Sequence, residues 1–171
     1  MTIEKKRKRA SAKSEKAVAE RLGGRRIAGS GCGLEKADGR VRGKYRIENK
    51  ITAKSSYRLT FDDWIKLWTA ASNSGEMPVF HVKMASEIVG TTEVVVIPAE
   101  QAPYSSATFY DHKERRGYLL SSWMFERRNA QRRFSLTGRY QDAPKKFALA
   151  ALPYDDFLTF VEAREDRDNS K

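Results

Sequence analysis

Two carboxylates and one lysine lie in a short stretch of the chain at a spacing that could support metal-dependent hydrolysis. Residues 44–52 alternate in polarity with a period of two, which predicts a strand with Glu48 and Lys50 on one face. Asp38 precedes this strand, and a hairpin would bring it beside Glu48. Clustered carboxylates repel one another, and a hard divalent cation such as Mg²⁺ relieves that repulsion. The spacing therefore predicts a Mg²⁺ site, and the simpler alternative is a solvent-exposed ion pair on an edge strand.

A third carboxylate is expected to point toward the same place from a helix. Ser14 could cap a helix that ends before Gly23, and Glu15 falls on the apolar face of that helix. A carboxylate on an inward face is costly unless it is used, so Glu15 is the preferred candidate and Glu20 the alternative. With two histidines and one cysteine, none at zinc-like spacing, a zinc site is not expected.

The net charge of the chain limits the kinds of partner. It is +11 over 171 residues, which predicts a polyanionic partner, and nucleic acid is favoured because no basic amphipathic helix of membrane type is present. A single cysteine excludes an internal disulfide and fits a reducing compartment. No signal peptide or membrane-spanning run is recognised, so we expect a cytoplasmic location.

The remaining pattern indicates a mixed α/β (α+β) fold. Residues 1–13 are predicted to be a basic flexible arm, 14–98 a core, and 99–171 a C-terminal extension of strands and a final helix, packed on the core. Thr60 and Asp63 predict the start of a helix with an apolar stripe, and Pro153 predicts the start of the last helix. The stretches predicted as strands are VFHVKM, TTEVVVIPA, YLLSSWMF, RRFSLTG and KFALAAL, and RYQDAPKK is predicted as a loop.

The ordered set of residues resembles a known nuclease superfamily. Asp38, followed after nine residues by Glu48-Asn49-Lys50, is similar to the PD-(D/E)-x-K motif, with Ala37 at the position of its loosely kept proline. Residues 14–98 as a whole resemble the Holliday-junction resolvases of archaea and phages. The shared features are Glu15, the run Arg26-Ile27-Ala28-Gly29-Ser30, Asp38, Glu48-Asn49-Lys50-Ile51-Thr52, the helix from Thr60, and Pro78-Val79-Phe80.

The resemblance implies a restriction-endonuclease-like core, a central mixed sheet flanked by helices, that cuts DNA with Mg²⁺, or Mn²⁺ as a substitute. It implies a homodimer acting on four-way or other branched DNA in recombination and repair, and a phage or prokaryotic source. Metal ligands would be Asp38, Glu48 and the Asn49 carbonyl; Lys50 would be the catalytic lysine and Glu15 would support the metal or its water. Phosphate contacts would come from Arg26, Ser30 and Lys54.

Two alternatives remain open at this level. The chain could be a nuclease of the same superfamily with nicking, restriction-like or exonuclease activity, because residues 99–171 have no recognised counterpart in the resolvases. It could also be a non-catalytic architectural DNA-binding protein, although carboxylates facing phosphate would then oppose binding. A basic cluster at Arg127, Arg128, Arg132 and Arg133 is either a second DNA contact or a charged face.

Overall fold

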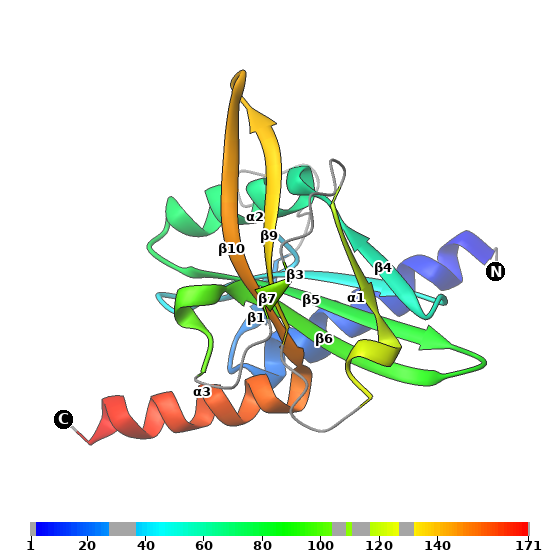
Figure 1. The fold of residues 1–171 in the computed structure, drawn as a ribbon. Helices are drawn as coiled ribbons and strands as arrows, with labels where there is room; N and C mark the ends of the chain where they lie inside the picture. The colour runs from blue at the N-terminus through cyan, green and yellow to red at the C-terminus, as the bar shows by residue number, and fades with distance from the viewer. Residues whose placement is uncertain (1–2, 28–36, 104–108, 111–116, 127–131, 171) are drawn as a thin grey trace.

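The computed structural model describes residues 3–27, 37–103, 109–110, 117–126 and 132–170, and in these a mixed β-sheet is flanked by helices on both faces (Figure 1). The predicted α/β class with a central mixed sheet is confirmed. Eight of the described strands form this sheet in the order β1-β2-β3-β5-β6-β10-β9-β7, and β4 pairs separately with β8. The elements are α1 Ile3–Arg21, β1 Arg25–Arg26, β2 Gly39–Val41, β3 Tyr45–Thr52, β4 Ser56–Leu59, α2 Phe61–Ser72, β5 Met77–Ser86, β6 Gly90–Pro98, β7 Phe109–Tyr110, β8 Tyr118–Ser121, β9 Arg132–Tyr140, β10 Ala143–Pro153 and α3 Tyr154–Asn169, with short 3₁₀ turns at Ala99–Gln101 and Ser122–Met124.

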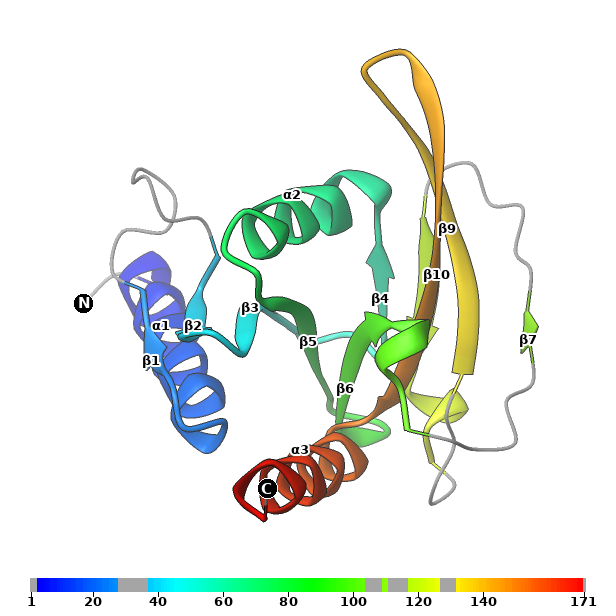
Figure 2. The ribbon, with the colours of Figure 1, turned by 90° about the vertical axis from the view of Figure 1, so that its left-hand side faces the viewer.

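The two faces of the sheet bury separate apolar clusters. α1 and α3 cover one face, where Val18 and Phe157 pack with Ile47 of β3. α2 covers the other face, where Trp64 packs with Phe80 of β5. Figure 2 shows α2 on one side of the strands and α3 on the other. Because side chains alternate along β3, the neighbours of Ile47 point toward the α2 side.

The start of α2 agrees with its sequence signals. The Thr60 hydroxyl accepts a hydrogen bond from the Asp63 backbone N–H at 3.1 Å, so the predicted cap is confirmed. Trp64 is fully buried, whereas Trp68 keeps 38% of its surface exposed and packs against Phe147 at a ring separation of 5.3 Å. Thr60 therefore places the acidic first turn of α2 next to β4.

The first helix begins earlier than the sequence predicts. α1 starts at Ile3, so residues 3–13, predicted as part of a flexible arm, belong to the helix, and Ser14 lies within it instead of capping it. The run from Ile3 to Arg21 contains no Gly or Pro, and most of its residues are Ala, Lys, Arg and Glu, which favour helix. Helix propensity has therefore outweighed the like-charge repulsion that favours an extended arm.

Strands β7, β9 and β10 of the C-terminal part of the chain belong to the main sheet, whereas β8 pairs with β4. β10 pairs antiparallel with β6 from Leu149 to Pro153, and β9 pairs with β10 along its whole length. The stretch RYQDAPKK, predicted as a loop, instead closes the β9–β10 hairpin. Only Gln141 and Asp142 lie between the strands, with φ of 50° and 58°, the left-handed geometry of a tight two-residue turn.

Candidate active site

β2 and β3 bring the predicted aspartate and glutamate together. The β2–β3 ladder ends at Gly39 opposite Ile47, and beyond it the Asp38 carboxylate accepts the backbone N–H of Asn49 at 2.9 Å. Lys50 Nζ donates to Glu48 Oε1 at 2.6 Å, and the two side chains are 35% and 23% exposed. The two carboxylates and the lysine therefore lie together on neighbouring segments, as the sequence predicts.

The neighbours of Glu48 do not fully stabilise the charged form of its carboxylate. Burial raises the pKa of Glu48 above its usual 4.5, the charge of Asp38 raises it further, and Lys50 offsets part of the rise. Burial lowers the pKa of Lys50, but the hydrogen bond and charge of Glu48 outweigh this, so the pKa lies above 10.5. At neutral pH, Lys50 is a cation beside a strained pair of carboxylates, an arrangement that a divalent cation would relieve.

Two residues that sequence reasoning did not place at the site belong to it. Burial, followed by the charge of Asp63, raises the pKa of Tyr57 to about 12, and the charges of Lys50 and Glu48 also act on it. Asp63 also accepts a hydrogen bond from the Thr60 hydroxyl at 2.8 Å. The sequence signal for Asp63 was its capping position, which does not reveal that the first turn of α2 faces β3.

Asn49 connects this site to the opposite face of the sheet. Its side chain points toward α1, where its Nδ2 lies 3.4 Å from the Ser14 hydroxyl, and its Oδ1 lies 2.7 Å from His81 Nδ1. His81 is fully buried, and its Nε2 lies 3.1 Å from Glu93, which also accepts from Lys83. Asn49, the middle residue of Glu48-Asn49-Lys50, is therefore held by its backbone N–H at Asp38 and by its side chain at Ser14 and His81.

The structure separates the two candidate helix carboxylates. Glu15 is half-buried on α1, beside Ser14, whereas Glu20 is exposed and pairs with Lys16 at 3.5 Å. α1 lies on the Ile47 face of β3, opposite the face of Glu48. Within the described residues, no three His, Cys, Asp or Glu side chains are grouped to hold a metal. The expected convergence of three carboxylates is thus not observed, and the role of Glu15 stays a prediction.

The predicted phosphate contacts are placed only in part. Arg26 belongs to β1, where its backbone pairs with Gly39, next to Asp38 in the chain, and its side chain lies outside the described residues. Ser30 also lies outside them. Lys54 is exposed just beyond β3, where its backbone N–H donates to the Thr52 hydroxyl at 3.1 Å.

The basic cluster is divided in the same way. Arg127 and Arg128 fall outside the described residues, whereas Arg132 and Arg133 begin β9 and are half-buried.

A buried carboxylate secures the strands that carry the site. Glu76, whose side chain is fully buried, accepts from Arg40 Nε at 2.6 Å, Arg46 Nε at 3.0 Å and the Gly43 backbone N–H at 3.2 Å. These bonds tie β2, the β2–β3 turn and β3 to the start of β5. This set of bonds around Glu76, the Glu76 clamp, fixes the β2–β3 hairpin that positions Asp38 and Glu48.

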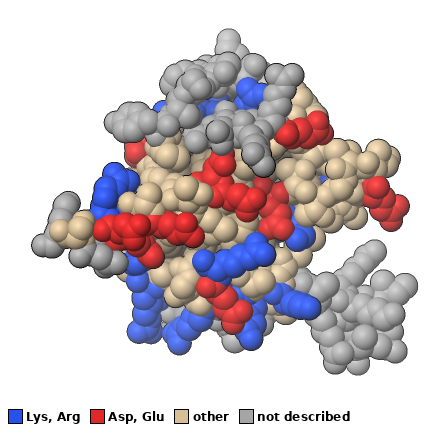
Figure 3. Space-filling model, turned by 90° about the horizontal axis from the view of Figure 1, so that it is seen from below, with Lys and Arg blue, Asp and Glu red and all other residues tan. Residues whose placement is uncertain are grey.

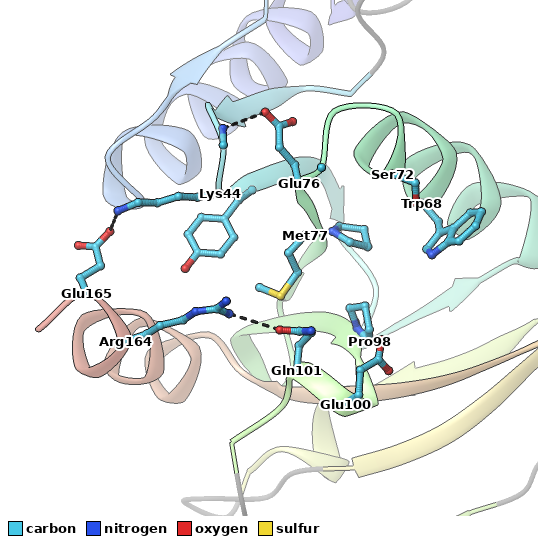
Figure 4. Close-up of a pocket in the computed structure, with 14 residues that line it drawn as sticks. Lys44, Trp68, Ser72, Glu76, Met77, Pro98, Glu100, Gln101, Arg164 and Glu165 are labelled. Atoms are coloured by element: carbon cyan, nitrogen blue, oxygen red, sulfur yellow. Dashed lines mark hydrogen bonds and ion pairs between the residues drawn. The ribbon is translucent and has the colours of Figure 1, made fainter. Parts of the chain in front are cut away.

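Glu76 also lines a hollow of about 490 Å³ at the amino-terminal ends of β3 and β5 (Figure 4). Across this hollow Lys44 pairs with Glu165 at 2.5 Å, and Arg164 donates to Gln101 at 3.4 Å. The hollow is thus spanned by internal contacts and does not include Glu48 or Lys50.

Comparison with known proteins gives a limited likeness. No family model matches the chain, and no curated protein matches it. Among solved structures, the Holliday junction resolvase Hjc of Archaeoglobus fulgidus is similar with a TM-score of 0.37 and 18% identity, over 56% of this chain and 78% of that one. None of the described helices is long and apolar enough to cross a membrane. The functional argument therefore depends on the chain's own residues.

Proposed function

We propose that this chain is a divalent-metal-dependent DNA endonuclease that cuts branched DNA, in particular four-way junctions. The observation that carries the proposal is the pair Asp38 and Glu48, with the charge of one raising the pKa of the other and Lys50 2.6 Å from Glu48. Such a cluster would oppose DNA binding unless a cation neutralised it, yet the chain carries a net charge of +11. The preference for junctions is supported by the resemblance of residues 14–98 to the resolvases.

The donor set suits Mg²⁺ or Mn²⁺, because it consists of carboxylate and carbonyl oxygens. Asp38, Glu48 and the backbone carbonyl of Asn49 would hold the cation. When bound, it would polarise the scissile phosphodiester and make an attacking water more acidic. The raised pKa of Glu48 means that protons and the cation compete for this carboxylate.

The residues of the chain supply the remaining parts of the reaction. Lys50, protonated at neutral pH, would donate to the phosphate oxygens or orient the water for in-line attack. With a pKa of about 12, Tyr57 keeps its phenolic proton at neutral pH, and a hydrogen bond with the Asp63 carboxylate holds that proton. Asp63, which interacts with that phenol, would set its orientation.

A homodimer would suit a junction substrate. A four-way junction resolves only when two strands of like polarity are cut, so two copies of the site are required. Two-fold pairing of identical chains is the commonest way to provide two equivalent sites.

The test compares labelled four-way junction, linear duplex and single strand, each with Mg²⁺ and with EDTA. Wild type should nick the junction symmetrically in Mg²⁺, and Glu48→Ala should abolish cutting. Lys50→Ala should slow cutting by about 10²- to 10³-fold while junction binding persists, since one transition-state donor is worth roughly this much. Lys66→Ala, an exposed lysine on α2, is the matched control and should cut normally.

Other outcomes would change the conclusion. Equal cutting of all three substrates would indicate a general nuclease. Tight binding without cutting in Mg²⁺ or Mn²⁺ would refute catalysis and leave an architectural DNA-binding protein. If Lys50→Ala lost both binding and cutting, the lysine would be structural.

A further inference from the structure

The β9–β10 hairpin extends out of the sheet to which its base belongs. β10 pairs with β6 only over Leu149–Pro153, whereas its pairing with β9 continues outward to Ala143 opposite Tyr140. The outer part of the hairpin is therefore a two-stranded ribbon standing clear of the domain (Figures 1 and 2). Its tight turn at Gln141 and Asp142 leaves no loose loop at the tip.

The outer part of the ribbon is exposed and basic. Every residue from 139 to 146 is exposed. Within this stretch Arg139, Lys145 and Lys146 provide three cations against the single anion Asp142. Pairing places Lys146 opposite Thr137 and Lys145 opposite Gly138, so the two lysines project from opposite faces of the ribbon. A polyanion lying along either face would meet a cation.

The ribbon rises on the same side of the sheet as the candidate site. Glu48 and Lys50 point to the α2 side, because they alternate with Ile47 on the α1 side. At the base of the ribbon, Leu136 and Phe147 pack into the cluster beneath α2. The ribbon then extends past α2, away from α3 (Figure 2).

Aromatic packing against α2 fixes the base of the ribbon. The ring centroid of Phe147 lies 5.9 Å from Phe61 and 5.3 Å from Trp68. Gly138 allows the close approach of Phe61, since an added Cβ would lie 2.1 Å from Phe61 Cγ. The base therefore holds the basic tip at a defined place relative to α2.

Helix α3 has the opposite character. The described acidic side chains of α3 are Asp155, Asp156, Glu162, Glu165 and Asp166, against Arg164 and Arg167. Seen from below, acidic side chains run across the middle of this face, with Lys and Arg side chains beside them (Figure 3). DNA would therefore be repelled by α3 itself and attracted to the exposed cations of the ribbon.

We propose that residues 139–146 form a DNA-binding arm that grips the sugar-phosphate backbone beside the cleavage site. Arg139, Lys145 and Lys146 provide the phosphate contacts, and the ribbon form suits a DNA groove, since a major groove of about 12 Å admits a two-stranded β-ribbon. The inference rests on the proposed function for its substrate, but DNA binding by the arm can be measured without cleavage.

The test is fluorescence anisotropy with a labelled four-way junction and no divalent metal, at several salt concentrations. Lys145→Ala/Lys146→Ala is compared with Arg164→Ala/Arg167→Ala, which removes the same charge from exposed positions on α3. Each phosphate contact is worth up to about eightfold at roughly 0.1 M salt, so the arm variant should bind up to about 60-fold more weakly. The slope of log affinity against log salt should fall by about 1.8, the α3 variant should bind like wild type, and Lys145→Arg/Lys146→Arg should restore binding.

Several results would overturn the arm. Wild-type affinity and salt slope in the lysine variant would exclude it, as would an equal loss in both variants, which would show that only net charge matters. Weaker binding with an altered thermal midpoint and no rescue by arginine would indicate a structural role. Failure of the proposed function would be a separate observation. If the wild type never cuts DNA, but the lysine variant binds DNA more weakly than the wild type, the DNA-binding arm stands and the nuclease is refuted.

Discussion

Substituting Ala37 by proline, the residue that the nuclease motif loosely keeps at this place, should damage this chain. Ala37 is buried and has φ of 99°, whereas the proline ring holds φ near −65°. No small adjustment spans that difference, so Ala37→Pro must move the segment that carries Asp38. In this chain alanine therefore tolerates a backbone geometry that proline cannot adopt.

The size of the effect follows from the hydrogen bonds that Asp38 makes. Its backbone N–H donates to Ile47, its carbonyl accepts from Ile27, and its carboxylate accepts from Asn49, each at 2.9 Å. At about 1 kcal/mol net for each bond, their loss lowers the free energy of unfolding by about 3 kcal/mol. For a chain of this size, the thermal midpoint falls by about 6–12 °C. Cleavage should be lost, because Asp38 no longer faces Glu48.

Ala37→Gly is the matched control. A positive φ costs alanine about 1–2 kcal/mol, and glycine avoids this cost. The gain roughly offsets the two losses that glycine brings, namely the buried methyl group and the greater conformational freedom of the unfolded chain. Its stability should lie within about 1 kcal/mol of wild type, and its cleavage should be retained. Urea unfolding followed by tryptophan fluorescence, with junction cleavage in Mg²⁺, measures both variants. A proline variant as stable and active as wild type would refute the assigned geometry of Ala37.

Three further predictions concern stability. Gly138→Ala should cost about 1–3 kcal/mol through overpacking against Phe61, and Phe61→Leu should recover part of this in a double-mutant cycle; additive losses would contradict the close contact. Glu76→Ala should cost about 3–5 kcal/mol in urea unfolding, because it leaves two arginines without their shared buried carboxylate, and a loss below 1 kcal/mol would count against the Glu76 clamp. A hydrogen bond with His81 is the main cause that lowers the pKa of Glu93 to about 2, so its stabilisation is present above pH 4.5 and lost as pH falls through 2. Glu93→Gln should therefore cost about 1–2 kcal/mol at pH 7 and almost nothing near pH 2; an equal cost at both values would disprove the linkage.

The sequence predicted β3 and the polar face that carries Glu48 and Lys50, because alternation is a local property. Ile47, Glu48 and Lys50 alternate between a buried face and a polar face, and this pattern holds whatever the strand pairs with. The cap at Thr60 was predictable for the same reason, since its partner Asp63 is three residues away.

The errors occurred where distant contacts or a competing local preference decide the conformation. The positive φ of Ala37 is set by its buried position next to the Asp38 hydrogen bonds, and no residue type at or near this position predicts it. The turn at Gln141 and Asp142 lacks the Asn-Gly or Asp-Gly signal, so the long β9–β10 pairing must impose it. Tyr57 was missed because β4 meets the site only through the tertiary fold.

The pairing of β6 with β10 limits how far this protein could be shortened. β6 lies between β5 and β10, and its residues Val94 to Ile97 are completely buried. A fragment ending near Pro98 would retain every motif residue, but β6 would become a hydrophobic edge strand with unpaired backbone N–H and C=O groups. Exposed edge strands of this kind pair with other chains and lead to aggregation. The length to which this chain can be truncated without aggregating is therefore set by the strand that pairs with β6. A minimal nuclease built from it would need a substitute for β10.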